Sequence, residues 1–198
     1  MTDEKLLQRA GRGDETAFLL LYERHRAPVF RFAYRMLGGV ELAEDVTHDC
    51  FLDLMKNPQR FDPARSALRT YLFAAARNLA YKHFRQPFND GAATLDITDV
   101  RDELRLPARE EPLGKLLDAE LSFEVRKAIA SLPPLQREAV VLFEFEELTL
   151  QEVAEIVGAD TGTVKSRLFR AREGLRRSLA AYFKSEPEIA IASEKIYK

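Results

Sequence analysis

The chain of 198 residues lacks tryptophan, and it has only one cysteine, Cys50, and three histidines. One cysteine cannot form an intramolecular disulfide, so the chain suits a reducing compartment. No apolar stretch is long enough to cross a membrane, and the polar residues 1–15 do not have the pattern of a signal peptide. We therefore expect a cytoplasmic protein that is not inserted in a membrane.

Patterns typical of catalysis are also absent. The sequence has no phosphate-binding glycine loop, no nucleophile elbow and no paired clusters of histidine and cysteine. Asp45, His48 and Asp49 have the spacing to share one helix face and hold a metal, but no matching ligand pair occurs elsewhere. We expect a protein that is not an enzyme, needs no metal or cofactor and has no small-molecule substrate.

The net charge is close to zero, −2 from 30 basic and 32 acidic residues, which excludes nucleic-acid binding by bulk charge alone. The charges are nevertheless segregated along the chain. Residues 63–89 contain five basic residues and no acid, whereas residues 90–120 contain nine acids and four bases. This distribution predicts basic, DNA-competent segments on either side of an acidic connector.

Helical capping residues and a 3.6-residue apolar period recur along the chain. Asp14 is expected to cap a helix that Pro28 interrupts, and the segment after Pro28 is expected to end at Gly38. Further helices are expected at residues 41–56 and 66–85. Since no segment alternates convincingly with a period of two residues, we expect an all-α fold.

Composition divides the chain into two small helical domains, at residues 1–88 and 115–184. Between them, residues 89–114 are rich in proline and acids, which is typical of a flexible linker. We expect the tail at residues 185–198 to be disordered.

Residues 131–177 have the pattern of a DNA-reading helix-turn-helix. Thr149 and Glu152 form a T-x-x-E capping box that begins one helix. Gly158 is suited to end that helix, because glycine readily adopts a left-handed backbone conformation. A second helix follows after a tight turn.

This second helix is expected to begin at a cap formed by Asp160 or Thr161 and to contact DNA. Val164 and Leu168, with the apolar residues that continue their spacing, should pack inward. Residues 161–172 contain four bases and no acid, so the outward side should be basic. The residues predicted to contact bases or phosphates are Thr161, Thr163, Lys165, Ser166, Arg167 and Arg170.

The helix expected at residues 41–56 should present an acidic face with an exposed leucine, which suits docking on a basic partner. Cys50 should lie on the opposite side as a buried core thiol. The residues of the docking face are Asp45, His48, Asp49 and Leu52.

The helix expected at residues 66–85 should bury its leucines and present aromatic and cationic groups on its other side, as single-stranded DNA binding requires. The loop before it combines an amide, a cation and a ring, a set that can hold an unstacked base. The residues predicted to contact DNA here are Asn57, Arg60, Phe61, Thr70, Arg77, Asn78 and Tyr81.

Together these stretches resemble the extracytoplasmic-function (ECF) sigma factors, the smallest members of the sigma-70 family. The matching segments are GDETAF, ELAEDVTHDCFLDLM, FDPARSALRTYLFAAARNLAYKHFR and SLPPLQREAVVLFEFEELTLQEVAEIVGADTGTVKSRLFRARE, and they cover most of residues 13–180. GTVKSRLFRAR is the most specific of them. The sequence departs from the family's usual residues at His48 and Asp49, where glutamine and glutamate are usual, and at Tyr71, where tryptophan is common.

The resemblance implies a factor that binds core RNA polymerase and directs promoter-specific initiation. Its region 2 would dock on the β′ clamp helices through the face at residues 45–52 and would open the −10 element. Its region 4, the helix-turn-helix, would read the −35 element and contact the β flap. The resemblance also implies an anti-sigma factor as a partner. The alternative is a stand-alone helix-turn-helix regulator, which gives no reason for the acidic and aromatic-basic helices of the N-terminal half.

Overall fold

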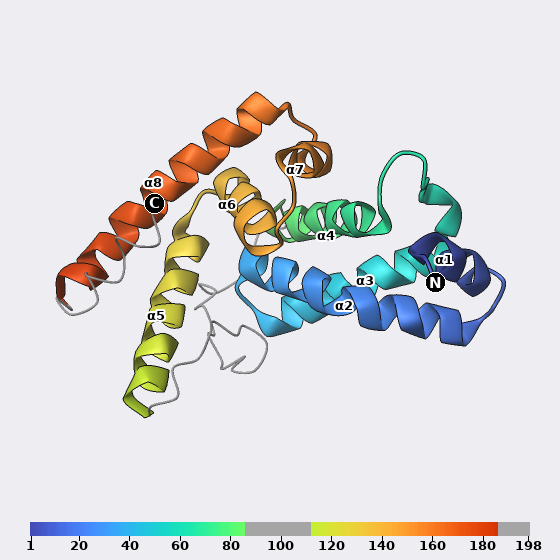
Figure 1. Cartoon of the computed structure of the whole chain (residues 1–198), viewed down its shortest axis with the longest axis horizontal. Coiled ribbons are helices and arrows are strands. Elements are labelled where there is room, and N and C mark those ends of the chain that lie inside the picture. Colours follow the sequence, from blue (N-terminus) through green and yellow to red (C-terminus); the bar gives the residue numbers. More distant parts are fainter. Residues whose placement is uncertain (86–111, 186–198) are drawn as a thin grey trace.

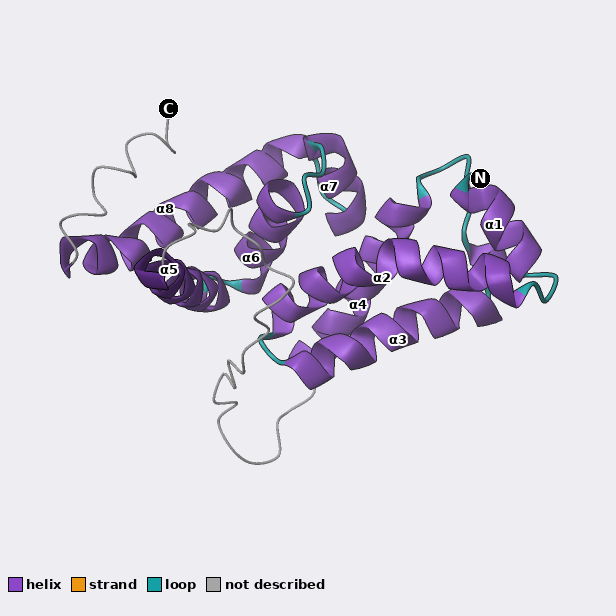
Figure 2. Ribbon diagram, turned by 60° about the horizontal axis from the view of Figure 1, so that its bottom comes forward, coloured by secondary structure: helices purple, strands orange, loops and turns teal. Residues whose placement is uncertain are grey.

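The computed structural model describes residues 1–85 and 112–185, which form helices joined by short turns (Figure 1, Figure 2). No strand occurs in these two segments, so the expected all-α fold is confirmed. Most of the predicted linker and nearly all of the predicted tail lie outside the described residues. The elements are α1 (Asp3–Ala10), α2 (Glu15–Leu37), α3 (Val40–Lys56), the 3-10 turn η1 (Pro58–Arg60), α4 (Leu68–Arg85), α5 (Pro112–Ser131), α6 (Pro134–Val140), the π-helical turn η2 (Val141–Phe145), α7 (Leu150–Val157) and α8 (Thr161–Ser185).

Helix α2 is continuous through Pro28, so the predicted interruption is wrong. A proline inside a helix removes one backbone donor and costs about 3 kcal/mol. Leu21, Val29 and Phe32 of α2 are buried on both sides of the proline. Burying three such side chains contributes roughly 4–9 kcal/mol, which exceeds the cost of the proline.

The two ends of α2 have the expected caps. The Asp14 carboxylate accepts a hydrogen bond from the Ala17 N–H at 3.0 Å, and Gly38 ends the helix with a φ of +79°. Helix α4 begins at Leu68, two residues later than expected, because the preceding turn is closed by hydrogen bonds to the carbonyl of Asp62. The caps predicted from the sequence therefore match both ends of α2, and the turn at Asp62 explains the later start of α4.

Helices α1 to α4 form an N-terminal group in which α2, α3 and α4 surround one apolar core (Figure 2). Phe32 and Phe73 meet edge to face at its centre, with ring centroids 5.6 Å apart. Cys50 is 1% exposed in the same core, as expected. Burial raises the pKa of its thiol to about 12, so Cys50 is an unreactive core residue.

Helices α5 to α8 form a C-terminal group that contains the helix-turn-helix. Both hydrogen bonds of the capping box between Thr149 and Glu152 are present, and Gly158 ends α7 with a φ of +65°. Asp160, one of the two expected caps, begins α8 by accepting a hydrogen bond from the Thr163 N–H at 2.8 Å. The predicted helix, turn and second helix are confirmed.

The two groups pack against each other in the described structure (Figure 1). Helix α7 lies against α4, and α5, α6 and η2 lie against α2. Among the helices at residues 1–85 and 112–185, none is long and apolar enough to span a bilayer. The contact between the groups decides which of the predicted site residues are accessible.

Candidate nucleic-acid and protein interfaces

The outward side of α8 is basic, as predicted. Lys165, Ser166 and Arg170 are exposed, while Val164 and Leu168 pack inward. Within the described residues, the side chains of Lys165 and Arg170 make no hydrogen bond or ion pair. These two cations are therefore available to phosphates or base edges outside the protein.

The hydroxyl groups on this helix already have partners in their own backbone turn. Thr163 Oγ1 donates to the Asp160 carboxylate at 2.6 Å, and Ser166 Oγ donates to the Gly162 carbonyl at 3.0 Å. The hydroxyl and the backbone N–H of Thr163 both lower the pKa of Asp160. Each hydroxyl oxygen can still accept a hydrogen bond, while Thr161 is half-buried at the start of the helix.

Arg167 is engaged inside the protein rather than directed to solvent. Its Nη1 lies 3.0 Å from Oε1 of Glu138, a residue of α6 that is fully buried. Arg77 of α4, in the other helical group, lies 2.6 Å from Oε2 of the same carboxylate. One carboxylate thus holds one residue from each of the two predicted DNA-contact sets.

The loop that contains η1 presents only part of its predicted set. Asn57 Nδ2 donates to Asp53 Oδ1 at 2.7 Å, and Arg60 Nη1 lies 3.1 Å from the same oxygen. Phe61 is 8% exposed and packs edge to face on Tyr71, with ring centroids 5.6 Å apart. In this conformation the polar groups of the loop are accessible, and the Phe61 ring belongs to the core.

Helix α4 differs from the prediction at one position. Thr70 is 3% exposed, so its expected place on an open face is wrong. It lies seven residues before Arg77, on the side of α4 that meets the C-terminal group. Asn78 is exposed, and Tyr81 is half-buried beneath Arg77, whose Cζ lies 4.8 Å from the ring centroid. Burial raises the pKa of Tyr81 to about 12, and the nearby Glu138 carboxylate adds to the shift.

The four residues of the predicted docking face lie together on the outer side of α3. Asp45, His48, Asp49 and Leu52 are all exposed, Leu52 at 43%. This arrangement places an apolar group within an acidic surface, which suits a basic helical partner.

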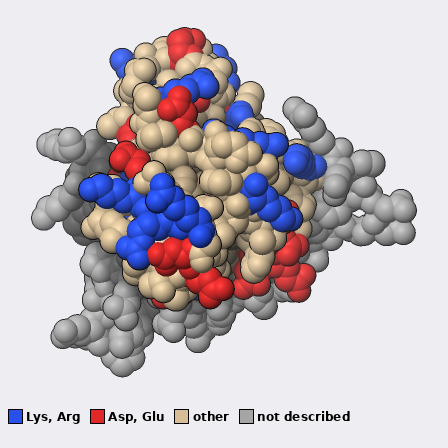
Figure 3. Space-filling view, turned by 90° about the vertical axis from the view of Figure 1, so that its right-hand side faces the viewer, with Lys and Arg blue, Asp and Glu red and all other residues tan. Residues whose placement is uncertain are grey.

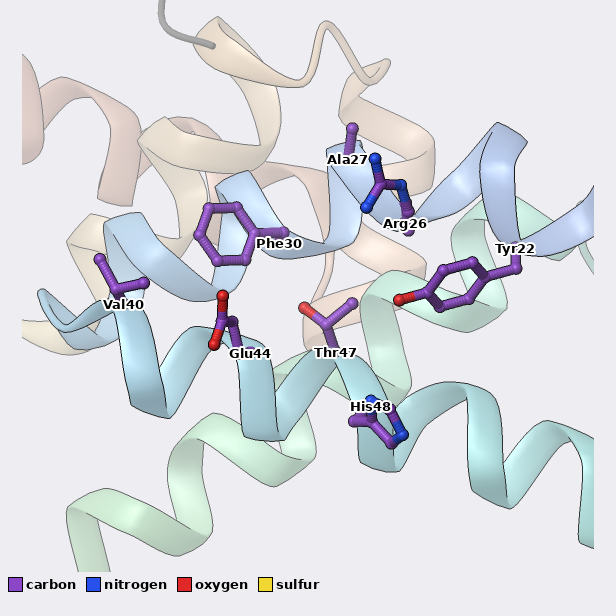
Figure 4. Close-up of a pocket in the computed structure, with 8 residues that line it drawn as sticks. All are labelled: Tyr22, Arg26, Ala27, Phe30, Val40, Glu44, Thr47 and His48. Atoms are coloured by element: carbon purple, nitrogen blue, oxygen red, sulfur yellow. The ribbon is translucent and has the colours of Figure 1, made fainter. Parts of the chain in front are cut away.

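A pocket of about 420 Å³ lies beside this face, between α2 and α3 (Figure 4). Phe30 and Val40 give it apolar walls, and Arg26 and Glu44 bring charges of both signs. His48 lines the pocket and also belongs to the docking face, so the two surfaces are continuous.

Two family models match this chain. "Sigma-70 region 2" matches residues 21–87, and "Sigma-70, region 4" matches residues 122–175. The ECF RNA polymerase sigma factor SigW of Bacillus subtilis is 30% identical over 184 residues, which cover 90% of this chain and 97% of SigW. The ECF RNA polymerase sigma-E factor of Escherichia coli K12 is 30% identical over 179 residues, which cover 88% of this chain and 93% of that protein. The chain belongs to the ECF sigma factors of the sigma-70 family.

Two solved structures share the fold of this ECF sigma factor. CnrH, in complex with the cytosolic domain of CnrY, has a TM-score of 0.66 at 23% identity and covers 90% of this chain and 97% of its own. RpoE of Bartonella quintana, in complex with the anti-sigma factor NepR, has a TM-score of 0.59 at 24% identity and covers 84% of this chain and 96% of its own. At these identities the likeness concerns the fold.

Membership of the family decides between the two functions that the sequence left open. The protein is a sigma factor that directs promoter recognition by RNA polymerase, rather than a stand-alone regulator. Sigma factors are not enzymes. Among the described residues, no group of three or more histidines, cysteines and acids is placed to hold a metal ion.

The surface of this ECF sigma factor separates the two signs of charge over part of one face. On the face that forms the right-hand end of Figure 1, lysine and arginine side chains gather across the middle and acidic side chains lie below them (Figure 3). Such segregation lets a chain with a net charge of −2 present local basic surfaces.

Sequence reasoning about this sigma factor missed one exposed residue on α8. Phe169 is 68% exposed, the highest value among the large apolar side chains of the described segments. It lies three residues after Ser166 and one before Arg170, on the basic side of the helix. The signal was present in the sequence, because an aromatic residue outside the inward period of Val164 and Leu168 must face solvent.

Sequence reasoning also missed Glu146, a second buried acid of the sigma factor's C-terminal group. It is 2% exposed, and its carboxylate lies 2.8 Å from Arg35 Nη1 and 3.7 Å from Arg31 Nη2, both on α2. Burial raises the pKa of Glu146 and lowers the pKa of Arg35, while their mutual attraction opposes both shifts. Partners more than 100 residues away cannot be read from local spacing.

Proposed function

We propose that this sigma factor reads the −35 element with α8 and opens the −10 element with α4 and the loop that contains η1. The observation that carries the proposal is the basic outward side of α8, where Lys165 and Arg170 are exposed and have no polar partner at residues 1–85 or 112–185. Lys165 suits a phosphate, and Arg170 suits a guanine edge in the major groove. Phe169, beside Arg170, offers an apolar surface for a thymine methyl group.

On α4, we assign the −10 element to the exposed Asn78 and the half-buried Tyr81, with Asn57 and Arg60 of the preceding loop. Unstacking a base costs a few kcal/mol, and stacking on an aromatic ring returns about 1–3 kcal/mol per base. Arg77 and Thr70 belong to the same predicted set and are covered in the described conformation. Their participation requires the two helical groups to separate.

We propose the outer face of α3 as the docking surface for the β′ clamp helices of core polymerase. This proposal is supported by the exposure of Asp45, Asp49 and Leu52 on one face. His48, on the same face, also lines the neighbouring pocket. A basic partner helix would find opposite charge around an apolar contact. The β flap is assigned to the C-terminal group.

We place the protein in the cytoplasm, where core polymerase acts, and propose an anti-sigma factor as a further partner. The second assignment is supported by the fold shared with RpoE, whose structure contains the anti-sigma factor NepR. The proposed domain limits remain residues 1–88 and 115–184, although α5 begins at Pro112.

The experiment is a run-off transcription assay with purified core polymerase and a template library randomised at the −35 and −10 elements. We expect transcripts that depend on this protein and that share both elements. Arg170→Ala should weaken selection at one −35 position by about 1–3 kcal/mol, with core binding unchanged. Absence of specific transcripts from every template, together with no competition for core, would refute the proposed function.

A further inference from the structure

A group of exposed cations surrounds the loop that contains η1. It consists of Arg12, Lys56 and Arg65, which we call the cationic rim. Lys56 ends α3 directly before η1, and Arg65 follows η1 by five residues. Arg12 belongs to the turn after α1, and this turn lies against η1, because the Cβ position of Gly11 is 3.8 Å from Cγ of Pro58. The rim therefore joins one cation from α1 with two from the other side of η1.

The side chains of the rim have no polar partner inside the described structure. Within residues 1–85 and 112–185, none of the three makes a hydrogen bond or an ion pair. Their neighbours are paired: Nη2 of Arg9 lies 2.6 Å from Oδ2 of Asp14. Likewise, Nη1 of Arg60 lies 3.1 Å from Oδ1 of Asp53. The rim is thus the part of this surface whose positive charge is free to bind an external anion.

The acid nearest in sequence to the rim has its carboxylate engaged by the backbone. Asp62 Oδ1 accepts a hydrogen bond from the Ala64 N–H at 2.9 Å, and the Asp62 carbonyl accepts one from the Arg65 N–H at 3.1 Å. These two bonds fix the turn that carries Arg65. Residues 56–66 contain three bases and this one acid. The loop around η1 is therefore locally positive, although the whole chain has a net charge of −2.

The position of the rim agrees with the view of the molecule's surface. Helix α1 lies at the right-hand end of Figure 1, and Figure 3 shows that lysine and arginine side chains gather across the middle of that end. The acidic side chains of the same face lie below them. An anionic chain can therefore cross this end of the molecule on its basic part.

The chemistry of the rim fits the phosphates of a single DNA strand. Guanidinium and ammonium groups bind phosphate oxygens without reading the base. The nearby ring of Phe61 is only 8% exposed, so the rim offers charge rather than a stacking surface. It also borders Asn57 and Arg60, which the proposed function assigns to a base of the −10 element. A strand with a base at that loop continues past it, and its next phosphates cross the surface that carries the rim.

We propose that the cationic rim is a further DNA-contact surface, which holds the phosphates of the melted strand beside the −10 base without reading their sequence. The inference rests on the proposed function, because that function places a −10 base at the loop that contains η1. It extends the promoter contact onto the turn after α1 and the end of α3. Neither of the two predicted sets of DNA-contact residues includes a member of the rim.

Each phosphate contact of the rim should add to the salt dependence of binding. For single strands, the slope of log affinity against log salt changes by about 0.7 for each phosphate that a protein neutralises. Three contacts therefore predict a slope that is steeper by about 2.

The test compares two single-stranded oligonucleotides that bind to the holoenzyme of core polymerase and this sigma factor. The short one carries only the selected −10 element of the non-template strand. The long one adds about eight thymidines at each end, a length within the usual site size for single strands. Fluorescence anisotropy at several salt concentrations gives the affinity of each. We expect the long oligonucleotide to bind more tightly and with the steeper slope.

The decisive variants are Arg12→Ala, Lys56→Ala and Arg65→Ala. Each should lower the slope measured with the long oligonucleotide by about 0.7, and the three together should bring it close to the slope of the short one. Binding of the short oligonucleotide should keep the wild-type affinity, because it lacks the flanking phosphates. Arg12→Lys retains the charge and should keep the wild-type slope.

The matched control is Lys127→Ala, which removes an exposed cation of α5 that belongs neither to the rim nor to the predicted DNA-contact sets. It should leave both slopes unchanged. Circular dichroism and competition for core polymerase establish that each variant is folded and forms holoenzyme. Since the rim side chains are exposed and unpaired in the described segments, their replacement should alter neither property.

Two results would overturn the rim. One is an equal slope for the wild type and the triple variant on the long oligonucleotide. The other is an equal loss of slope in Lys127→Ala, because the effect would then come from the overall charge of the protein.

A long oligonucleotide with a scrambled −10 element separates this inference from the proposed function. If the wild type prefers the selected element and the rim variants keep the wild-type slope, the rim fails and the proposed function stands. If the wild type binds both sequences equally and the rim variants still lose slope, the rim stands as a single-strand surface and the proposed reading of the −10 element fails.

Discussion

Replacing Phe169 with alanine isolates one contact of the proposed −35 interface. Fully burying a phenylalanine side chain is worth about 1.5–3 kcal/mol. Because Phe169 is 68% exposed, only the corresponding part remains for DNA to cover, which gives about 1–2 kcal/mol. We therefore expect Phe169→Ala to weaken binding of polymerase holoenzyme to a −35 element by roughly 5- to 30-fold. The stability of the protein should not fall, because the ring makes little contact with the core.

The assay is fluorescence anisotropy with a labelled duplex that carries the selected −35 element, repeated at several salt concentrations. Phe169 is uncharged, so its loss should lower the affinity equally at every salt concentration. Lys165→Ala should instead reduce the slope of log affinity against log salt by about one, because one phosphate contact is lost. Phe123→Ala is the matched control, since Phe123 is 39% exposed on α5 and belongs to neither predicted set of DNA-contact residues.

An affinity for the −35 duplex that is unchanged in Phe169→Ala would refute the placement of this ring against DNA. A loss of thermal stability equal to the loss of affinity would also contradict it, because the effect would then come from folding. A loss of affinity that vanishes at high salt would assign the contribution to charge instead of apolar contact.

Three further predictions concern the other surfaces. Asp49→Arg should weaken core binding by roughly tenfold through repulsion from a basic partner, whereas Glu4→Arg on α1 should not; equal competition for core by both variants would exclude the α3 face. Asn78→Ala should leave core binding intact and reduce the permanganate reactivity of −10 thymines; normal reactivity would remove Asn78 from the melting site. Because the pKa of Asp160 is lowered from 3.8, its contribution to stability is present above that pH and is lost as the pH falls through the lowered value. Asp160→Asn should therefore flatten the acid limb of the unfolding curve, and identical acid limbs in both proteins would contradict this role of the cap.

Most of the local structure of this chain is readable from its sequence. Thr149 with Glu152, Gly158 and Asp160 located the helix-turn-helix, because caps are short-range hydrogen bonds between residues a few positions apart. Pro28 was misread, since its local cost is outweighed by the burial of apolar residues on both sides of it.

The sites could be predicted only in part, for a different physical reason. The outward positions of α3 and α8 follow from helical period alone, and the structure exposes Asp49 and Arg170 as expected. The engagement of Arg77 depends on Glu138, which comes 61 residues later, and Thr70 is buried on a helix that packs against α7. A local sequence pattern does not predict a partner at that separation. The sequence of one helical group therefore does not show which of its faces the other group will cover.

Because α2 is one continuous helix, it connects the pocket rigidly to the contact between the two helical groups. Arg26, which lines the pocket beside the docking face, and Arg35, which holds Glu146, stand on one helix of 23 residues that Pro28 does not divide. At 1.5 Å per residue this helix is a rod of about 35 Å. A partner that tilts this helix at the pocket would therefore also move Arg35, and with it the contact between the two helical groups.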